Sequence, residues 1–296
     1  MGTSYDPVNL TQEDLDDLAT FYGSSREECR RRLLAYDVRE LRDAWLRADP
    51  HTPAEIRAFY AGTDLYVWEL MQWHASTARR QWTAARDLLS DHFPPAAWGR
   101  VLDYGCGVGT DALVLAQSGY DVCLADVPGV TFEFARHRFR RRGIDATYIA
   151  VTDDYPEVRG RYDILISIDV LEHLPDPVGV LRRLAAALRT GGIACIVAGF
   201  GDATGDRPCH LANNTERFGE ERASAWHRAV QALGLESMWP MLPYTYRKAG
   251  GTRHMALRLR YGFWKRTGLW VCKVRQGKPV LRWGIRREIG DDLCQR

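Results

Sequence analysis

The sequence lacks the features of several protein classes. None of its 296 residues belongs to an apolar run that approaches the roughly 20 residues needed to cross a bilayer. The N-terminus has neither the positive region nor the apolar core of a secretory signal peptide. The seven cysteines are scattered, with no C-x-x-C pair and no metal-ligand spacing. We therefore expect reduced thiols, a cytoplasmic protein, no membrane span and no metal site.

Acidic residues are missing from one long stretch. Between Ser237 and Arg287 there is no Asp or Glu, while Lys and Arg are frequent, although the whole chain has a net charge of only +2. One interpretation is a solvated face, or a face paired with the acidic N-terminal helices. The other is a positive rim that binds an anionic substrate through Arg258 and Arg260, because arginine matches carboxylates and phosphates.

The first 95 residues have the pattern of helices. Capping-box signatures start at Thr11 and Ser25, and Thr52 precedes a proline suited to a first helical turn. We expect a small helical module at about 10–48 and one or two longer helices within 53–93, which are rich in aromatic residues. Most of these rings are expected to be core packing.

From Trp98 onward, short apolar segments alternate with helical ones. We expect strands at about 100–104, 121–125, 146–151, 162–168, 193–198, 235–242, 269–274 and 280–285, and one helix over 216–233. Continuous apolar strands separated by helices imply a parallel sheet that is covered on both faces and binds ligands at its carboxyl edge. The interval 243–268 is interpreted as an insertion at the rim of that site.

The segment from Val101 to Thr110 (VLDYGCGVGT) leads a buried strand into three glycines at alternate positions. Glycine has no Cβ, so the backbone can adopt positive φ and pass close to a ligand. Thr110 stands where a dinucleotide fingerprint has its third glycine, and no Lys-Ser/Thr follows for a phosphate-binding loop. Asp126 ends the next strand, where a carboxylate can accept both hydrogen bonds of a ribose diol.

The glycine loop, Asp126 and the segment IDVLEHLP from Ile168 to Pro175 together resemble class I S-adenosylmethionine-dependent methyltransferases of the small-molecule type, over about residues 98–275. The resemblance implies an α/β fold: a seven-stranded, mostly parallel Rossmann-like sheet over 96–296, with a helical N-terminal cap over 1–95. It also implies S-adenosyl-L-methionine as cofactor, S-adenosyl-L-homocysteine as product, and methyl transfer to an O, N or C nucleophile.

The resemblance assigns cofactor-binding roles to particular residues. The glycine loop would present backbone N–H groups to the methionine carboxylate, Asp103 would help to hold the amino group, and Asp126 would bind the ribose. Asp153 would bind the adenine amino group, with Asp154 as the competing candidate. The whole expected set is Asp103, Gly105, Cys106, Gly107, Gly109, Asp126, Val127, Asp153, Ile168 and Asp169.

The acceptor side has two histidine candidates for catalysis. His210 follows the fifth strand and suits proton removal near neutrality, although a hydrogen bond to Asn213 or Asn214 would explain it equally well. His173 and the preceding Glu172 could form a metal or base pair, or simply fix their loop. Further expected substrate contacts are Tyr60, Tyr66, Trp73, His74, Tyr244 and Tyr246.

Two other functions stay open as alternatives. An RNA or tRNA methyltransferase would use the basic C-terminal region, but apolar strand positions interrupt its basic residues. A non-catalytic binding module would keep the fold for assembly, although the retained glycine loop and Asp126 disfavour this. We expect an enzyme that acts on a small molecule, either anionic or tethered to an acidic carrier protein, in natural-product or specialised metabolism.

Overall fold

The computed structural model describes residues 9–77, 79–153, 158, 161–201, 209–219, 222–238, 244–249, 270–273 and 279–282. It divides into two compact units, 1–248 and 249–296. In the second unit, β8 (Trp270–Lys273) and β9 (Pro279–Arg282) pair as an antiparallel ribbon. The predicted division between 1–95 and 96–296 stays a prediction.

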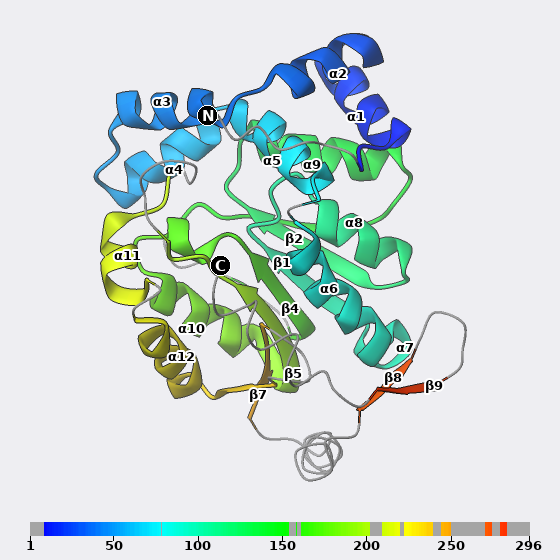
Figure 1. Ribbon diagram of the computed structural model, residues 1–296, viewed down its shortest axis with the longest axis vertical. Helices are drawn as coiled ribbons and strands as arrows, with labels where there is room; N and C mark the ends of the chain where they lie inside the picture. Colours follow the sequence, from blue (N-terminus) through cyan, green and yellow to red (C-terminus); the bar gives the residue numbers. More distant parts are fainter. Residues whose placement is uncertain are drawn as a thin grey trace. The chain divides into compact units, whose positions relative to one another are not determined.

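A seven-stranded sheet forms the centre of the first unit, as predicted (Figure 1). Its spatial order is β3-β2-β1-β4-β5-β7-β6, and the first five of these strands pair in parallel. β7 runs antiparallel to both β5 and β6. The strands are β1 (Arg100–Tyr104), β2 (Asp121–Asp126), β3 (Thr147–Ala150), β4 (Tyr162–Ile168), β5 (Leu188–Val197), β6 (Leu235–Ser237) and β7 (Thr245–Lys248).

Helices cover both faces of this sheet, and its central strands are therefore buried along nearly their whole length. In Figure 1, α10 (Pro177–Ala187) and α12 (Ala223–Ala232) lie on one side, and α6 (Arg80–His92) and α8 (Thr110–Gln117) lie on the other. The remaining helices are α7 (Pro95–Trp98), α9 (Val130–Arg141), the 3₁₀ turn η1 (Leu171–His173) and α11 (Ala212–Phe218).

The N-terminal region consists of the helices α1 (Gln12–Tyr22), α2 (Arg26–Ala35), α3 (Val38–Ala48), α4 (Pro53–Gly62) and α5 (Leu65–Ala75). Three of them, α1, α2 and α4, begin at the predicted caps, whereas α3 begins after Asp37 and α5 has no side-chain cap. Thr11 and Thr52 form reciprocal capping boxes, and the Ser25 hydroxyl accepts the N–H of Glu28. The interval 53–93 holds three helices rather than the one or two predicted, because the chain turns at Thr63 and again after Ser76.

The C-terminal part of the predicted sheet was wrong in detail. The segment 269–274 does not supply the seventh strand: β8 belongs to the separate ribbon, and β7 lies within the interval that was interpreted as an insertion. The four residues of β7 are too few for a strand to be recognised from alternating apolar and polar positions in the sequence. In the structure Tyr246 packs into the core, while the next residue, Arg247, pairs with Glu236. The predicted helix 216–233 is two helices, with α11 ending at Gly219.

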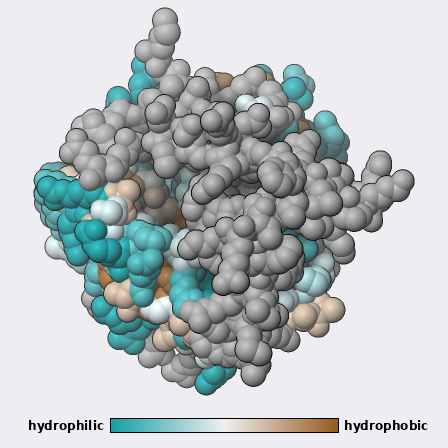
Figure 2. Space-filling model, turned by 60° about the horizontal axis from the view of Figure 1, so that its bottom comes forward, coloured by the Kyte–Doolittle hydropathy of each residue, from teal (hydrophilic) through white to brown (hydrophobic). Residues whose placement is uncertain are grey.

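The surface carries little exposed apolar bulk. Among the described residues, the large hydrophobic side chains that are exposed are Leu34 and Leu46, and the described part of the face in Figure 2 is mostly hydrophilic. No helix in the described part of the chain combines the length and hydropathy of a membrane span.

The N-terminal helices share a hydrophobic core with the sheet domain. Leu15 and Leu18 of α1 and Trp68 of α5 are buried in one cluster with Val108, from the glycine loop, and Phe134 of α9. Because this contact joins the cap to the segment that follows β1, the cap cannot separate without exposing apolar surface on both sides.

We predict that Leu18→Ala lowers the free energy of unfolding by about 2–5 kcal/mol, because Leu18 is fully buried between cap and sheet domain. Leu46→Ala is the matched control: Leu46 is 65% exposed, and a change of less than about 0.5 kcal/mol is expected. Urea unfolding followed by tryptophan fluorescence measures both. Equal effects of the two substitutions would contradict the shared core.

Candidate active site

A pocket lies at the carboxyl ends of β1, β2 and β4. Three parts of the chain line it. The sheet edge contributes Asp103, Tyr104, Gly105, Cys106, Gly107, Ala125, Asp126 and Val127. The N-terminal helices and the segment after them contribute Tyr60, Tyr66, Leu70, Trp73, His74 and Arg79. The end of β4 and the segment after it contribute Ile168, Asp169, Val170, His173 and Leu174.

The glycine loop has a backbone that only glycine adopts readily. Gly105, Gly107 and Gly109 have φ of 72°, 53° and 73°. A Cβ on Gly105 would lie 2.3 Å from a methyl of Val170, and one on Gly107 would lie 2.7 Å from a methyl of Leu70. The first two glycines therefore keep the pocket open, whereas Gly109 packs against α9 and the sheet behind the loop.

Asp126 is held at the end of β2 by the loop itself. Its Oδ2 accepts the N–H of Gly107 at 2.6 Å, and its Oδ1 accepts the N–H of Val127 at 2.7 Å. Burial raises the pKa of Asp126 to about 6, against the lowering effect of these hydrogen bonds. Each oxygen keeps a lone pair for a further donor, so the side chain fits a ribose diol.

Asp103 offers a second buried acceptor. Burial and the nearby charges of Asp111 and Asp126 raise its pKa, and its Oδ2 has no hydrogen-bond partner among the described residues. An unsatisfied buried carboxylate oxygen is costly unless a ligand supplies the donor. The ammonium group of the methionine portion is such a donor, so this site fits the cofactor expected from the sequence.

Arg79 was missed by the sequence analysis, because it lies in a short connection after α5 that shows no motif. Its guanidinium lines the pocket and bonds Asp111 at 2.5 Å and 3.3 Å. Arg86 bonds the same carboxylate at 2.9 Å, and although burial opposes it, the two arginines hold the pKa of Asp111 below its ordinary value. Among the described lining residues, Arg79 is the only Arg or Lys, so it suits the methionine carboxylate.

The opposite wall is aromatic and acidic. Tyr60 and Tyr66 lie with ring centroids 5.1 Å apart, and Trp73 Nε1 donates to Asp169 Oδ2 at 3.4 Å. Asp169 has a φ of 56°, a strained backbone for a residue other than glycine. Burial, then the charge of Glu172, raises the pKa of Asp169 to about 7. Glu69 of α5, which the sequence did not single out, has its pKa raised to about 8 by burial and by Asp169.

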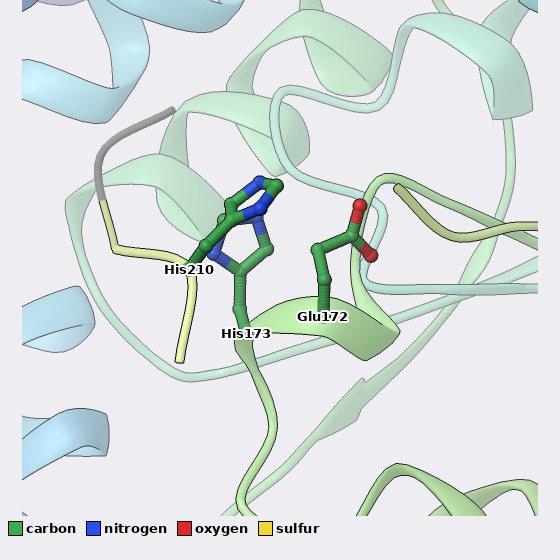
Figure 3. A group of neighbouring side chains, drawn as sticks. All are labelled: Glu172, His173 and His210. Atoms are coloured by element: carbon green, nitrogen blue, oxygen red, sulfur yellow. The ribbon is translucent and has the colours of Figure 1, made fainter. Parts of the chain in front are cut away.

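The two candidate catalytic histidines lie side by side with Glu172 (Figure 3). The rings of His173 and His210 are perpendicular, with centroids 4.8 Å apart. His173 Nδ1 lies 3.0 Å from the carbonyl oxygen of Cys209 and must donate to it, so the Nε2 of the neutral ring is an acceptor. Burial lowers the pKa of His173, which favours that neutral form.

The same three side chains also fit the competing explanations drawn from the sequence. Glu172 Oε1 accepts the N–H of Gly199 at 2.8 Å, and the Asn214 amide donates to the Glu172 carbonyl, so this segment does fix its loops. The candidate ligand atoms of Glu172, His173 and His210 lie within 4.8 Å of one another. The group could therefore hold a metal ion as well as act on a proton.

Several expected site residues lie elsewhere. Asp153 is exposed and is not part of the pocket lining, and Tyr246 is buried in the core because β7 lies beyond β5, away from the carboxyl edge of β1 and β4. Tyr244 comes just before β7 and does not line the pocket either. His74, in contrast, does line the pocket as expected, and burial lowers its pKa. Asp154, Arg258 and Arg260 lie outside the described residues.

Comparison with known proteins identifies the family. Residues 74–237 match the family described as Methyltransferase domain, and the chain belongs to that family. The chain therefore has a methyltransferase domain of the α/β Rossmann-like class, with S-adenosylmethionine as its cofactor. The glycine loop, Asp126 and the two candidate catalytic histidines, His173 and His210, all fall within the matched residues.

Individual relatives are similar over shorter stretches. The ubiquinone biosynthesis O-methyltransferases of Bordetella avium and Vibrio parahaemolyticus are each 39% identical over 95 residues, which is 31% of this chain. The aligned part spans only 39% and 40% of those relatives. Among solved structures, the 1,6-didemethyltoxoflavin-N1-methyltransferase of Burkholderia thailandensis is 19% identical with a TM-score of 0.43, covering 68% of this chain and 92% of that one.

We predict that Asp126→Ala weakens binding of S-adenosylhomocysteine by about 1.5–3 kcal/mol, the value of paired hydrogen bonds to a charged acceptor. Asp121→Ala, at the exposed opposite end of the same strand, is the control and should bind normally. Isothermal titration calorimetry measures both. An Asp126→Ala variant with the affinity of the unmodified protein would exclude the ribose assignment.

The pKa of Asp126 gives a pH dependence of defined sign. Because the folded-state pKa of about 6 lies above the ordinary value of 3.8 for an aspartate, the ligand-free protein loses stability as pH rises from about 4 to 6. Two ribose donors favour the ionised carboxylate, so S-adenosylhomocysteine affinity should rise as the ligand-free Asp126 ionises around pH 6, by up to about tenfold between pH 5 and 7. Asp126→Asn should abolish this rise in affinity. If the variant still binds S-adenosylhomocysteine more tightly at pH 7 than at pH 5 by the same factor as the unmodified protein, the assignment to Asp126 is contradicted.

Proposed function

We propose that this methyltransferase transfers its methyl group to the hydroxyl oxygen of a small aromatic compound. The observation that carries the proposal is one pocket with two unlike walls. One wall has the loop, Asp126 and Asp103, which fit the cofactor, and the other has Tyr60 and Trp73 beside a neutral histidine. The names of the ubiquinone biosynthesis O-methyltransferases, which share part of the sequence, support oxygen as the acceptor atom.

The residues of the first wall bind and orient the cofactor. Bound S-adenosylmethionine supplies a methyl group already activated on a sulfonium. Arg79 would hold the methionine carboxylate, and Asp103 would accept from its ammonium group. Asp126 would accept the ribose hydroxyls, and Val127 would pack against the adenine. Ile168, the last residue of β4, and Asp169 line the same pocket and would border the reacting end of the cofactor.

The residues of the second wall act on the acceptor. Tyr60, Tyr66 and Trp73 exclude water and give a flat ring a surface to stack on. His173 accepts the hydroxyl proton at Nε2, because its Nδ1–H is committed to the carbonyl of Cys209. The edge-to-face contact with His210 limits rotation of the His173 ring. In-line attack then needs positioning more than further activation.

The kind of acceptor, the metabolic role and the location that the sequence suggested remain proposals. An anionic or carrier-tethered acceptor that binds Arg258 and Arg260 is one such proposal, and both arginines lie outside the described residues. A role in specialised metabolism and a cytoplasmic location belong to the same proposal. The aromatic wall supports a small acceptor rather than a nucleic acid.

The test is incubation of the protein with S-adenosylmethionine carrying an isotopically labelled methyl group and a panel of catechols, phenols, aromatic amines and aromatic carboxylates. Mass spectrometry with fragmentation should place the label on a phenolic oxygen. Label on nitrogen, on carbon or on added tRNA would overturn the proposal, as would cofactor binding without turnover on any acceptor.

We predict that His173→Ala lowers kcat by about 10²–10⁴-fold, the usual contribution of a positioned base. S-adenosylhomocysteine affinity should stay within a factor of about three, because no cofactor contact is removed. His51→Ala is the control, since His51 is 77% exposed in the loop before α4. Loss of cofactor affinity in parallel with kcat would mean that His173 only supports the fold of the pocket.

A further inference from the structure

A buried group of charges joins α1 to the end of α9. Asp17 is fully buried and accepts hydrogen bonds from Arg138, Arg141 and Arg142. Asp14 accepts from Arg138 at 2.7 Å and from Arg142 at 3.0 Å. Glu13, whose side chain is 65% exposed, pairs with Arg142 at the edge of the group, so that three carboxylates face three guanidinium groups. This balance is what allows charges to be buried without a large desolvation penalty.

Arg138 connects this group to the cofactor site. Its Nε bonds Asp17 and its Nη2 bonds Asp14, while its Nη1 donates to the carbonyl of Val108 at 2.7 Å and to the hydroxyl of Thr110 at 3.0 Å. Val108 and Thr110 flank the last glycine of the loop. One planar guanidinium, itself only 2% exposed, therefore ties two carboxylates of α1 to two groups of the glycine loop.

The loop has few means of its own to hold its shape. Alternate glycines carry no side chains to pack, and they lose the most backbone freedom on ordering. On the cofactor side the loop is fixed by the bond from Gly107 N–H to Asp126 and by main-chain bonds of Gly105 N–H to the carbonyl of Ala125 and of Gly109 N–H to the carbonyl of Cys106. On the far side it is fixed by Arg138 and by Val108, which is buried against Leu15 and Leu18 of α1.

We propose that Asp17 is a positioning residue for the cofactor: through Arg138 it holds the glycine loop in its binding conformation, so that docking of α1 and binding of the cofactor are energetically coupled. Separation of α1 would leave Arg138 buried beside the loop without its carboxylates, a costly state that the loop would have to relieve by moving. A ligand that needs the ordered loop must then stabilise the docked helix by the same free energy.

The first experiment compares neutral substitutions in the full chain. Asp17→Asn keeps the size of the side chain and removes its charge, and it should weaken S-adenosylhomocysteine binding by about 5–100-fold, the usual range of coupling between sites. Asp16→Asn is the matched control: Asp16 lies on the same helix and pairs with Arg26, and in the described part of the chain it accepts no hydrogen bond from Arg138, Arg141 or Arg142, although the charge of Arg141 also acts on it. It should bind normally.

The second experiment tests the reciprocal effect without any substitution in α1. In the unmodified protein, saturating S-adenosylhomocysteine should slow hydrogen exchange of the α1 amides. Thr110→Val removes only the hydroxyl that Arg138 contacts on the loop, and it should reduce both this protection and the affinity. These measurements decide the question even if Asp17→Asn fails to fold.

The outcomes separate positioning from plain stability. A lowered melting temperature in Asp17→Asn with unchanged cofactor affinity would overturn the proposal, and so would α1 exchange that is the same with and without the ligand. All readouts use cofactor binding alone. Failure of the proposed hydroxyl methylation would therefore leave this result intact.

Discussion

The fixed backbone of the glycine loop is the constraint on which the rest of the structure depends. A ligand can reach the main chain only where Cβ atoms are missing, and the same absence deprives the loop of side-chain packing. Other elements must supply the restraint: Asp126 from β2, Arg138 from α9 and the apolar face of α1. The N-terminal helices are therefore tied to the loop by the physical needs of the loop, whatever else they contribute.

The electrostatics of the pocket follow from this arrangement. Asp103, Asp126 and Asp169 are gathered where three strands end, and burial raises the pKa of each. Such a site penalises its own negative charge until a cation enters, and a sulfonium that also carries an ammonium group is a cation of that kind. Arg79, already paired with Asp111, offers the one matching position for the carboxylate of the same ligand among the described lining residues.

The glycine loop and Asp126 could be placed at the sheet edge from sequence because their signals are local, whereas Asp153, expected beside the adenine, is exposed and does not line the pocket. Three alternate glycines and the acid at the end of the next strand follow from strand spacing, and both are where they were expected. Arg79 could not be found this way, since only the packing of the N-terminal helices brings it into the pocket. Tyr246 failed for the reverse reason: a rim position was assigned to a residue that sheet order places in the core.

The boundary of the family match divides the pocket in a way that bears on specificity. The match begins at residue 74, so Asp103, Asp126 and His173 lie inside it. The wall of Tyr60, Tyr66 and Trp73, together with the aliphatic Leu70, comes before residue 74. A wall outside the shared region is free to differ without disturbing the cofactor, provided that its helices still dock on the loop. The sheet domain would then determine cofactor binding, while α4 and α5 would determine the choice of acceptor. The contact of α1 with the glycine loop would hold these helices in place on the sheet domain.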